Sequence, residues 1–253
     1  MIVVSAQTTF SAYFDASGTK RSPILTVAGF VGRASKWERF NREWNEILVR
    51  EGVGFMHMTE FVSSRGEFSS WKGQTDRRRE FLSKLIHCIR RNTNKGFGGS
   101  LLLSDYAEIN NRFFLAETSG QPFTFCMRTC LGGLARWADN KGIPHNDITA
   151  AIERGDEDQG ELVNIARRDG FEVIRLQKAD APAFQAADIA AWKIRTVLRN
   201  AETAPLESVE DGERILQSLE PIRKIIHNNG GYDRVAMLTL CKRGRIPLRP
   251  TPT

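Results

Sequence analysis

The chain has 253 residues, 41% of them hydrophobic and 26% charged, which is the composition of a globular protein with a sizeable core. No run of residues is long and apolar enough for a membrane span, and the first residues lack a signal-peptide pattern, so we expect neither export nor a membrane partner. The formal net charge of +6 favours a polyanionic partner such as nucleic acid.

The four cysteines, Cys88, Cys126, Cys130 and Cys241, form no CxxC pair. Cys126 and Cys130 lie one helical turn apart, but no histidine accompanies them, so buried small hydrophobic side chains are the better interpretation. We therefore expect a reduced, cytoplasmic protein.

An antiparallel hairpin is predicted at the start of the chain. Apolar and β-branched residues indicate strands over 10–17 and 24–31, joined by a polar turn with glycine and proline. Tryptophan, phenylalanine and leucine then recur at helical spacing, which predicts a helix over 36–51.

Strand and helix patterns alternate through the rest of the chain. The predicted strands are 54–58, 98–104, 147–153 and 171–176, and the predicted helices are 75–92, 123–140, 159–169, 183–199 and 215–227. The stretches 63–74 and 105–122 are interpreted as loops. A hairpin followed by alternating strands and helices predicts an α/β fold, with a mixed sheet and helices on both faces.

Four acids stand near the ends of separate predicted elements: Asp15, Glu60, Glu153 and Asp188. If they converge, their charges repel one another unless something offsets them, and a pair of divalent cations does so. We therefore predict a two-ion site for Mg²⁺ or Mn²⁺. Taken singly, Asp15 also fits a structural turn and Glu60 a solvated surface, whereas Asp188 lies in an apolar helix where a lone charge is unfavourable.

The motifs around these acids resemble a known family. They are an Asp-x-Ser-Gly beginning at Asp15, a His-x-x-Glu ending at Glu60, an acid closing a middle strand at Glu153 and a Gln-x-x-Asp ending at Asp188. Together they resemble a bacterial family within the RNase H-like fold, domain of unknown function 3800 (DUF3800). The resemblance covers 8–200 and implies an RNase H-like domain there and, by analogy, metal-dependent phosphodiester chemistry. The rest of the chain, 201–253, is predicted from its own pattern to be a C-terminal helical extension packed on the same domain.

One position departs from the family's first motif, which usually reads Asp-Glu-Ser-Gly, because Ala16 replaces the glutamate. If residues 15 and 16 point to opposite faces of a strand, only Asp15 faces the metals and the change is harmless. If both served the site, the change would weaken it. Asp156 is an alternative to Glu153 as the acid of the middle strand.

The predicted reaction is hydrolysis of a nucleic-acid phosphodiester by an in-line water. Asp15 would bridge the two ions, Glu60 and Asp188 would hold one each, and Glu153 would complete the site. His57 would move protons or contact a phosphate, and Lys178 would balance charge on the scissile group.

The alternative is an inactive RNase H-like module that binds nucleic acid, or a partner protein, in a defence or mobile-element system. That reading assigns binding to the basic clusters and predicts salt-sensitive, metal-independent association.

Overall fold

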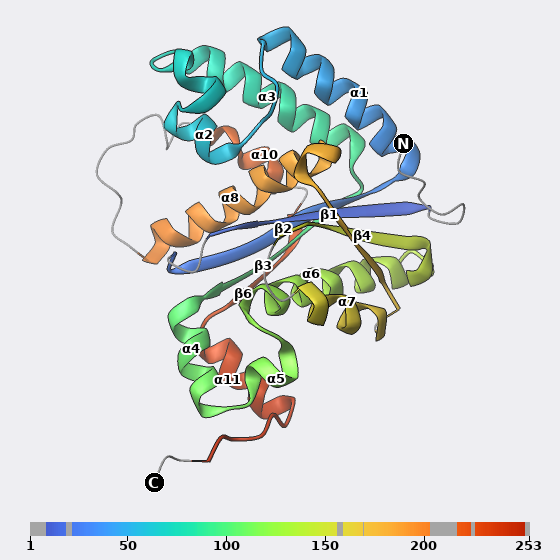
Figure 1. The fold of residues 1–253 in the computed structure, drawn as a ribbon, viewed down its shortest axis with the longest axis vertical. Coiled ribbons are helices and arrows are strands. Elements are labelled where there is room, and N and C mark those ends of the chain that lie inside the picture. The colour runs from blue at the N-terminus through green and yellow to red at the C-terminus, as the bar shows by residue number, and fades with distance from the viewer. Residues whose placement is uncertain are drawn as a thin grey trace.

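The computed structural model describes residues 9–18, 22–155, 159–168, 170–202, 217–223 and 226–250. Within these residues the core is a six-stranded mixed sheet of order β5-β4-β1-β2-β3-β6 (Figure 1). The strands are β1 Phe10–Ser17, β2 Ile24–Arg33, β3 Lys95–Leu102, β4 Ile148–Glu153, β5 Glu172–Leu176 and β6 Ile226–Tyr232.

Strand direction brings most carboxyl ends of the sheet to one edge. Strand β2 pairs antiparallel with both β1 and β3, while β1–β4, β4–β5 and β3–β6 pair in parallel. Of the described strands, β2 therefore runs against the other five, whose carboxyl ends share what we call the carboxyl edge. Ligand sites in α/β proteins form at such edges, where connections leave the sheet in different directions.

Helices cover both faces of the sheet (Figure 1). Helices α1 (Ala34–Glu51), α3 (Thr75–Asn92) and α8 (Ala183–Glu202) lie on one face, and α6 (Pro122–Asp139) and α7 (Gln159–Arg168) lie on the other. The predicted mixed sheet with helices on both faces is confirmed.

The shorter helices lie around this frame. They are α2 (Met58–Ser63), α4 (Leu103–Arg112), α5 (Leu115–Ser119), α10 (Glu220–Arg223) and α11 (Arg234–Arg243), with 3₁₀ turns η1 (Gly66–Trp71), η2 (His145–Asp147) and η3 (Lys178–Asp180). None of the described helices combines the length and the apolar composition needed to cross a membrane.

The alternation of side chains along β1 divides the interior into two cores. Phe10, Ala12 and Phe14 are buried on the α6 face, whereas Tyr13 packs on the α8 face. Because successive residues of a strand point to opposite faces, Asp15 points to the α8 face with Tyr13. The α8 face is therefore where the first predicted site residue lies.

The strand predicted over 54–58 is wrong. Residues 55–57 have no regular secondary structure, and Met58 already begins α2. The backbone N–H groups of Gly54 and Met56 donate to the Glu67 carboxylate and the Gln185 side-chain oxygen. Side chains satisfy this backbone, so it needs no neighbouring strand.

The helix predicted over 215–227 is wrong at its end, because Ile226 begins β6. Strand β6 is the outermost strand next to β3, with which it pairs in parallel, and α11 follows it in the chain. The two stretches interpreted as loops also contain helices, since 63–74 holds η1 and 105–122 holds most of α4 and the whole of α5. The division of the chain into 8–200 and 201–253 stays a prediction.

Candidate functional site

Three adjacent strands deliver charged side chains to the carboxyl edge. Asp15 lies near the end of β1, Glu153 closes β4, and Lys178 begins the 3₁₀ turn that follows β5. Strands β1 and β4 pair with Phe14 opposite Ile152, so Asp15 and Glu153 follow one step further along neighbouring strands. Strand pairing therefore explains why residues far apart in the sequence meet here.

The Lys178 ammonium lies among three carboxylates. Its Nζ is 2.6 Å from Asp15 Oδ2, 3.8 Å from Glu153 Oε2 and 4.0 Å from Asp188 Oδ1. The side chains of Asp15 and Lys178 are 3% and 16% exposed, so the closest pair is shielded from water. We call Asp15, Glu153, Lys178 and Asp188 the carboxylate cluster.

Helix α8 supplies Asp188 from above the sheet. The Met58 backbone N–H, at the start of α2, donates to Asp188 Oδ2 over 2.7 Å. One turn earlier on α8, the Gln185 side-chain oxygen accepts from Trp44 Nε1 (3.1 Å) and from the Met56 backbone N–H (2.8 Å). The Gln-x-x-Asp pattern therefore fixes α8 to α1 and to the chain before α2.

Burial and charge act on Asp188 in opposite directions. Desolvation raises the pKa of the Asp188 carboxyl and the neighbouring Asp15 raises it further, against the lowering effects of Lys178, the Met58 N–H and His57. For Lys178, burial disfavours the charge, but Asp188, Asp15 and Glu153 outweigh it and the pKa of the ammonium is raised. The cluster therefore holds a firmly protonated lysine.

His57 and Glu60 flank the cluster without joining it by a described hydrogen bond or ion pair. His57 precedes α2, and its charge acts on Asp188. The Glu60 carboxylate lies over Gly66, where an added Cβ would overlap it. The structure thus brings together Asp15, Glu153 and Asp188, and Glu60 as a metal ligand stays a prediction.

The departure at Ala16 removes no side chain from the cluster. Ala16 packs against the core on the α6 face, opposite to the face on which Asp15 meets Lys178. Its backbone N–H donates to Asp15 Oδ1 over 2.8 Å and helps orient that carboxylate. Asp156, the alternative to Glu153, lies outside the described residues.

Carboxylate oxygens are the donors that Mg²⁺ and Mn²⁺ prefer, so the chemistry of the cluster fits the predicted ions. Among the described residues, no three His, Cys, Asp or Glu side chains stand close enough together to hold a metal ion as they are placed. Lys178 occupies the space between the acids and supplies the positive charge there. Divalent ions would therefore have to compete with, or displace, this ammonium.

One residue of this region was missed by the sequence analysis. Arg195 follows Asp188 by seven residues, which is about two turns and the same side of α8. Its NH1 group donates to Ser22 Oγ over 3.3 Å, between the two strands of the first hairpin. The seven-residue spacing was visible in the sequence, but nothing there showed that this side of α8 faces the carboxyl edge.

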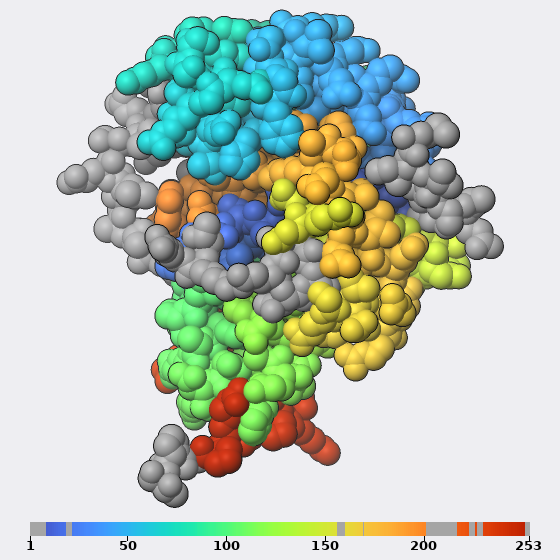
Figure 2. All heavy atoms as spheres, viewed as in Figure 1, coloured from blue at the N-terminus to red at the C-terminus, as the bar shows by residue number. Residues whose placement is uncertain are grey.

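The outer surface of the molecule near this edge is visible in Figure 2. Blue atoms of the first hairpin reach the surface between α8, in orange, and yellow-green atoms near the end of β4. The carboxyl edge is thus not sealed by α1 to α3, which lie above α8 in this view.

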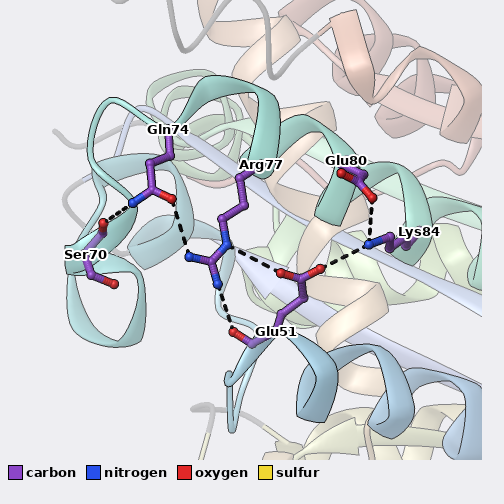
Figure 3. A network of polar contacts seen from close by, with 6 residues as sticks. All are labelled: Glu51, Ser70, Gln74, Arg77, Glu80 and Lys84. Atoms are coloured by element: carbon purple, nitrogen blue, oxygen red, sulfur yellow. Dashed lines mark hydrogen bonds and ion pairs between the residues drawn. The ribbon is translucent and has the colours of Figure 1, made fainter.

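A second polar network lies far from the cluster and joins α1 to α3 (Figure 3). Glu51 accepts from Arg77 and Lys84, and Lys84 also pairs with Glu80. Gln74 bridges Ser70 and Arg77 in the same network. Most of these side chains are exposed, which is typical of ion pairs that fasten helices rather than of a reactive site.

No family model matches the chain, and no curated protein matches it. Among solved structures, the crystal structure of ribonuclease H2 from Pyrococcus horikoshii OT3 is similar: 14% identical, covering 85% of this chain and 96% of that one, with a TM-score of 0.36. The fold is α/β, with helices on both faces of a six-stranded mixed sheet (Figure 1). Assignment of chemistry to this chain rests on the carboxylate cluster.

Proposed function

We propose that this protein is a metal-dependent nuclease that hydrolyses nucleic-acid phosphodiester bonds at the carboxylate cluster. The observation that carries the proposal is the convergence of Asp15, Glu153 and Asp188, from β1, β4 and α8, on one buried position at the carboxyl edge. Three acids gathered beside one lysine leave net negative charge, which a divalent cation and a phosphate would together complete.

The chain's own groups divide the work of such a reaction. Bound Mg²⁺ or Mn²⁺ would lower the pKa of a water and stabilise charge on the phosphate. Asp15 and Asp188 are held for this purpose by backbone N–H groups of Ala16 and Met58. We assign the Lys178 ammonium to offsetting negative charge on the scissile phosphate, and His57, whose charge acts on Asp188, to exchanging protons with a leaving oxygen.

We also propose membership of the DUF3800 family, on the motif residues Asp15, His57, Glu60, Gln185 and Asp188. Two findings support it. Gln185 and Asp188 both bind the segment that carries His57, so two separate motifs act as one unit. Ala16, where the motif departs, faces away from the site.

The experiment compares wild type with Asp15→Asn/Asp188→Asn on labelled single- and double-stranded DNA, RNA and hybrid, each with Mg²⁺, Mn²⁺ or EDTA. We expect cleavage by wild type with metal, none with EDTA and none by the double variant. Asp139→Asn is the matched control, because this exposed acid pairs with His145 before β4, at the opposite edge of the sheet. Cleavage that survives in the double variant would refute the assignment.

A binding module without turnover is the second candidate, and one observation favours it. Lys178 already pairs with Asp15 at 2.6 Å, so the cluster has a cation without any metal. In that case both proteins bind the same strands with equal, salt-sensitive affinity, and neither metal nor EDTA changes the result.

A further inference from the structure

The Arg195 guanidinium has donors that the described part of the chain does not use. Its Nε is buried and has no hydrogen-bond acceptor, and its described hydrogen bond is the long one from NH1 to Ser22. No described carboxylate lies within ion-pair distance of it. Buried guanidinium N–H groups are nearly always satisfied, so an unused one calls for an acceptor that the described residues do not supply.

Two neighbours place this guanidinium at the carboxyl edge. A Cβ at Gly18, just beyond β1, would lie 3.5 Å from Arg195 Cδ, so the arginine stem passes beside that glycine. Ser22, on the other arm of the hairpin, accepts from the guanidinium itself. Helical side chains lean toward the helix N-terminus, which brings the guanidinium of Arg195 back toward Asp188.

The electrostatics around Arg195 favour an anion. Burial and the charge of Arg199 lower the pKa of the Arg195 guanidinium, and the charge of Asp188 raises it. Asp188 is already bound to the Met58 N–H and faces Lys178, so it does not neutralise the arginine. The charge of Arg195 therefore has no described carboxylate paired with it.

We propose that Arg195, with Ser22, forms a phosphate-binding subsite that holds the phosphodiester next to the one placed at the carboxylate cluster. This inference rests on the proposed function, because it assumes a nucleic-acid strand at the cluster. The guanidinium fork suits the non-bridging oxygens of a phosphate, and Ser22 holds the guanidinium on the hairpin side of α8. The subsite fixes the strand's position along α8 and so selects which bond reaches the acids.

The test measures binding of a short fluorescein-labelled single strand in EDTA over a range of salt concentrations. It compares wild type with Arg195→Gln, Arg195→Lys and the control Arg50→Gln, an exposed arginine paired with Glu46 on α1. We expect Arg195→Gln to weaken binding about tenfold and to reduce the salt slope by about 0.7, the value for one phosphate contact on a single strand. Arg195→Lys should keep the slope while losing affinity, and Arg50→Gln should change neither.

A second measurement uses inorganic phosphate as the probe and thermal unfolding as the readout, against chloride at equal ionic strength. Wild type should gain stability from phosphate and Arg195→Gln should gain less. If Arg195→Gln matches wild type in strand affinity and salt slope, or, where no strand binds, in its response to phosphate, the subsite is refuted.

The two proposals fail separately. A wild type that binds strands through Arg195 but cleaves none refutes the nuclease and keeps the subsite. A wild type that cleaves, with strand binding unaffected by Arg195→Gln, keeps the nuclease and refutes the subsite. Urea unfolding of each variant shows whether it is folded. If Arg195→Gln does not fold, Arg195→Lys, which preserves the charge, is used in its place.

Discussion

Lys178 is the side chain on which the carboxylate cluster depends. A buried group of three acids without a cation would be strongly unfavourable, and the ammonium at 2.6 Å from Asp15 compensates part of that charge. The same ammonium stands where a divalent ion would gather the acids. We therefore expect Lys178 to stabilise the protein without metal and to compete with any divalent ion that binds there.

We predict that Lys178→Met lowers the free energy of unfolding in EDTA by about 3 kcal/mol, because it leaves buried carboxylates uncompensated. Mn²⁺ should recover much of this loss, and the variant should bind Mn²⁺ more tightly than wild type does. Urea unfolding with and without Mn²⁺, together with Mn²⁺ titration followed by electron paramagnetic resonance, measures both effects.

Lys84→Met is the matched control for that substitution. Lys84 also pairs with two acids, Glu51 and Glu80, but its side chain is 44% exposed and solvent screens the pairs. It should change stability little and Mn²⁺ affinity not at all. Weaker Mn²⁺ binding by Lys178→Met would mean that the lysine supports the ion rather than competing with it.

The sequence predicts the parts of the site that follow from local patterns, and it misses those that depend on how distant elements pack together. Asp15 and Glu153 were recognisable because acids stood at the ends of apolar strands, and strand ends are local features. The central position of Lys178 depends on β5 lying beside β4, which no local pattern reveals. Arg195 was missed for the same reason, because its position beside Gly18 and Ser22 depends on which side of α8 faces the hairpin.

At the scale of elements, Gln185 connects three of them. Its side-chain oxygen accepts from Trp44 on α1 and from the Met56 backbone before α2, and the residue is 4% exposed. Loss of this acceptor leaves two buried donors without partners. The orientation of α8, and with it that of Asp188, depends on this contact.

We therefore predict that Gln185→Ala lowers the free energy of unfolding by about 3 kcal/mol, measured by urea denaturation. Gln74→Ala is the control, since the Gln74 amide donates to an exposed Ser70 carbonyl that water can satisfy instead. Gln185→Glu keeps an acceptor oxygen and should cost less than Gln185→Ala. Equal effects of the two Gln185 variants would show that packing, not the acceptor, holds α8.

Close approach of backbones makes glycine necessary at one position of the central hairpin. A Cβ at Gly29 of β2 would overlap the Tyr13 carbonyl oxygen and lie 2.8 Å from the Phe14 Cα of β1. Backbone atoms of a paired strand cannot give way as a flexible side chain can. The distortion would fall on β1 next to Asp15.

We predict that Gly29→Ala destabilises the protein by about 3 kcal/mol and weakens Mn²⁺ binding at the cluster. Gly132→Ala in α6 carries the same chemical change where the nearest atom, on Arg136, is 3.7 Å away. It should stabilise by about 0.5–1 kcal/mol through helix propensity. Thermal unfolding of the two variants distinguishes them by sign, and a stable Gly29→Ala would contradict the packing described for β1 and β2.

The elements themselves were predictable where their patterns were strong. Strands β1 and β2 and the long helices carry clear apolar periodicities, and their predicted positions agree with the structure to within a few residues. Strand β6 was missed because His-Asn-Asn-Gly-Gly is typical of a turn. Tertiary packing requires the glycine at position 230, because a Cβ there would lie 2.5 Å from Thr129 of α6.

For the molecule as a whole, the sheet joins two cores that contain different cysteines. Cys88 of α3 is buried in the core on the α8 face, whereas Cys126, Cys130 and Cys241 are buried in the core on the α6 face. Cys241 lies on α11, after β6, in the part of the chain predicted to be a C-terminal extension. Labelling of the cysteines can therefore follow the unfolding of each core and of α11 separately.

Burial keeps these thiols from reacting in the folded protein. Desolvation raises the pKa of Cys88 to about 12, against an opposing contact from Asn92, and it also raises the pKa of Cys126, Cys130 and Cys241. The thiolate is the reactive form, so a thiol reagent near pH 8 should find almost none in the native state. Reaction then requires opening of the structure around each cysteine.

We predict that the four cysteines stay unlabelled by a thiol reagent in native buffer and become reactive together as urea unfolds the protein. Strand β6 pairs with β3 and α11 packs against β6 and α4, so the end of the chain should unfold with the sheet. Labelling at increasing urea, with each site quantified by mass spectrometry, gives one midpoint for all four. An earlier midpoint for Cys241 alone would make residues 201–253 a separately unfolding extension. An earlier midpoint for Cys88 would mean that the α8 face, which includes the helix that carries Asp188 and Arg195, opens before the sheet does.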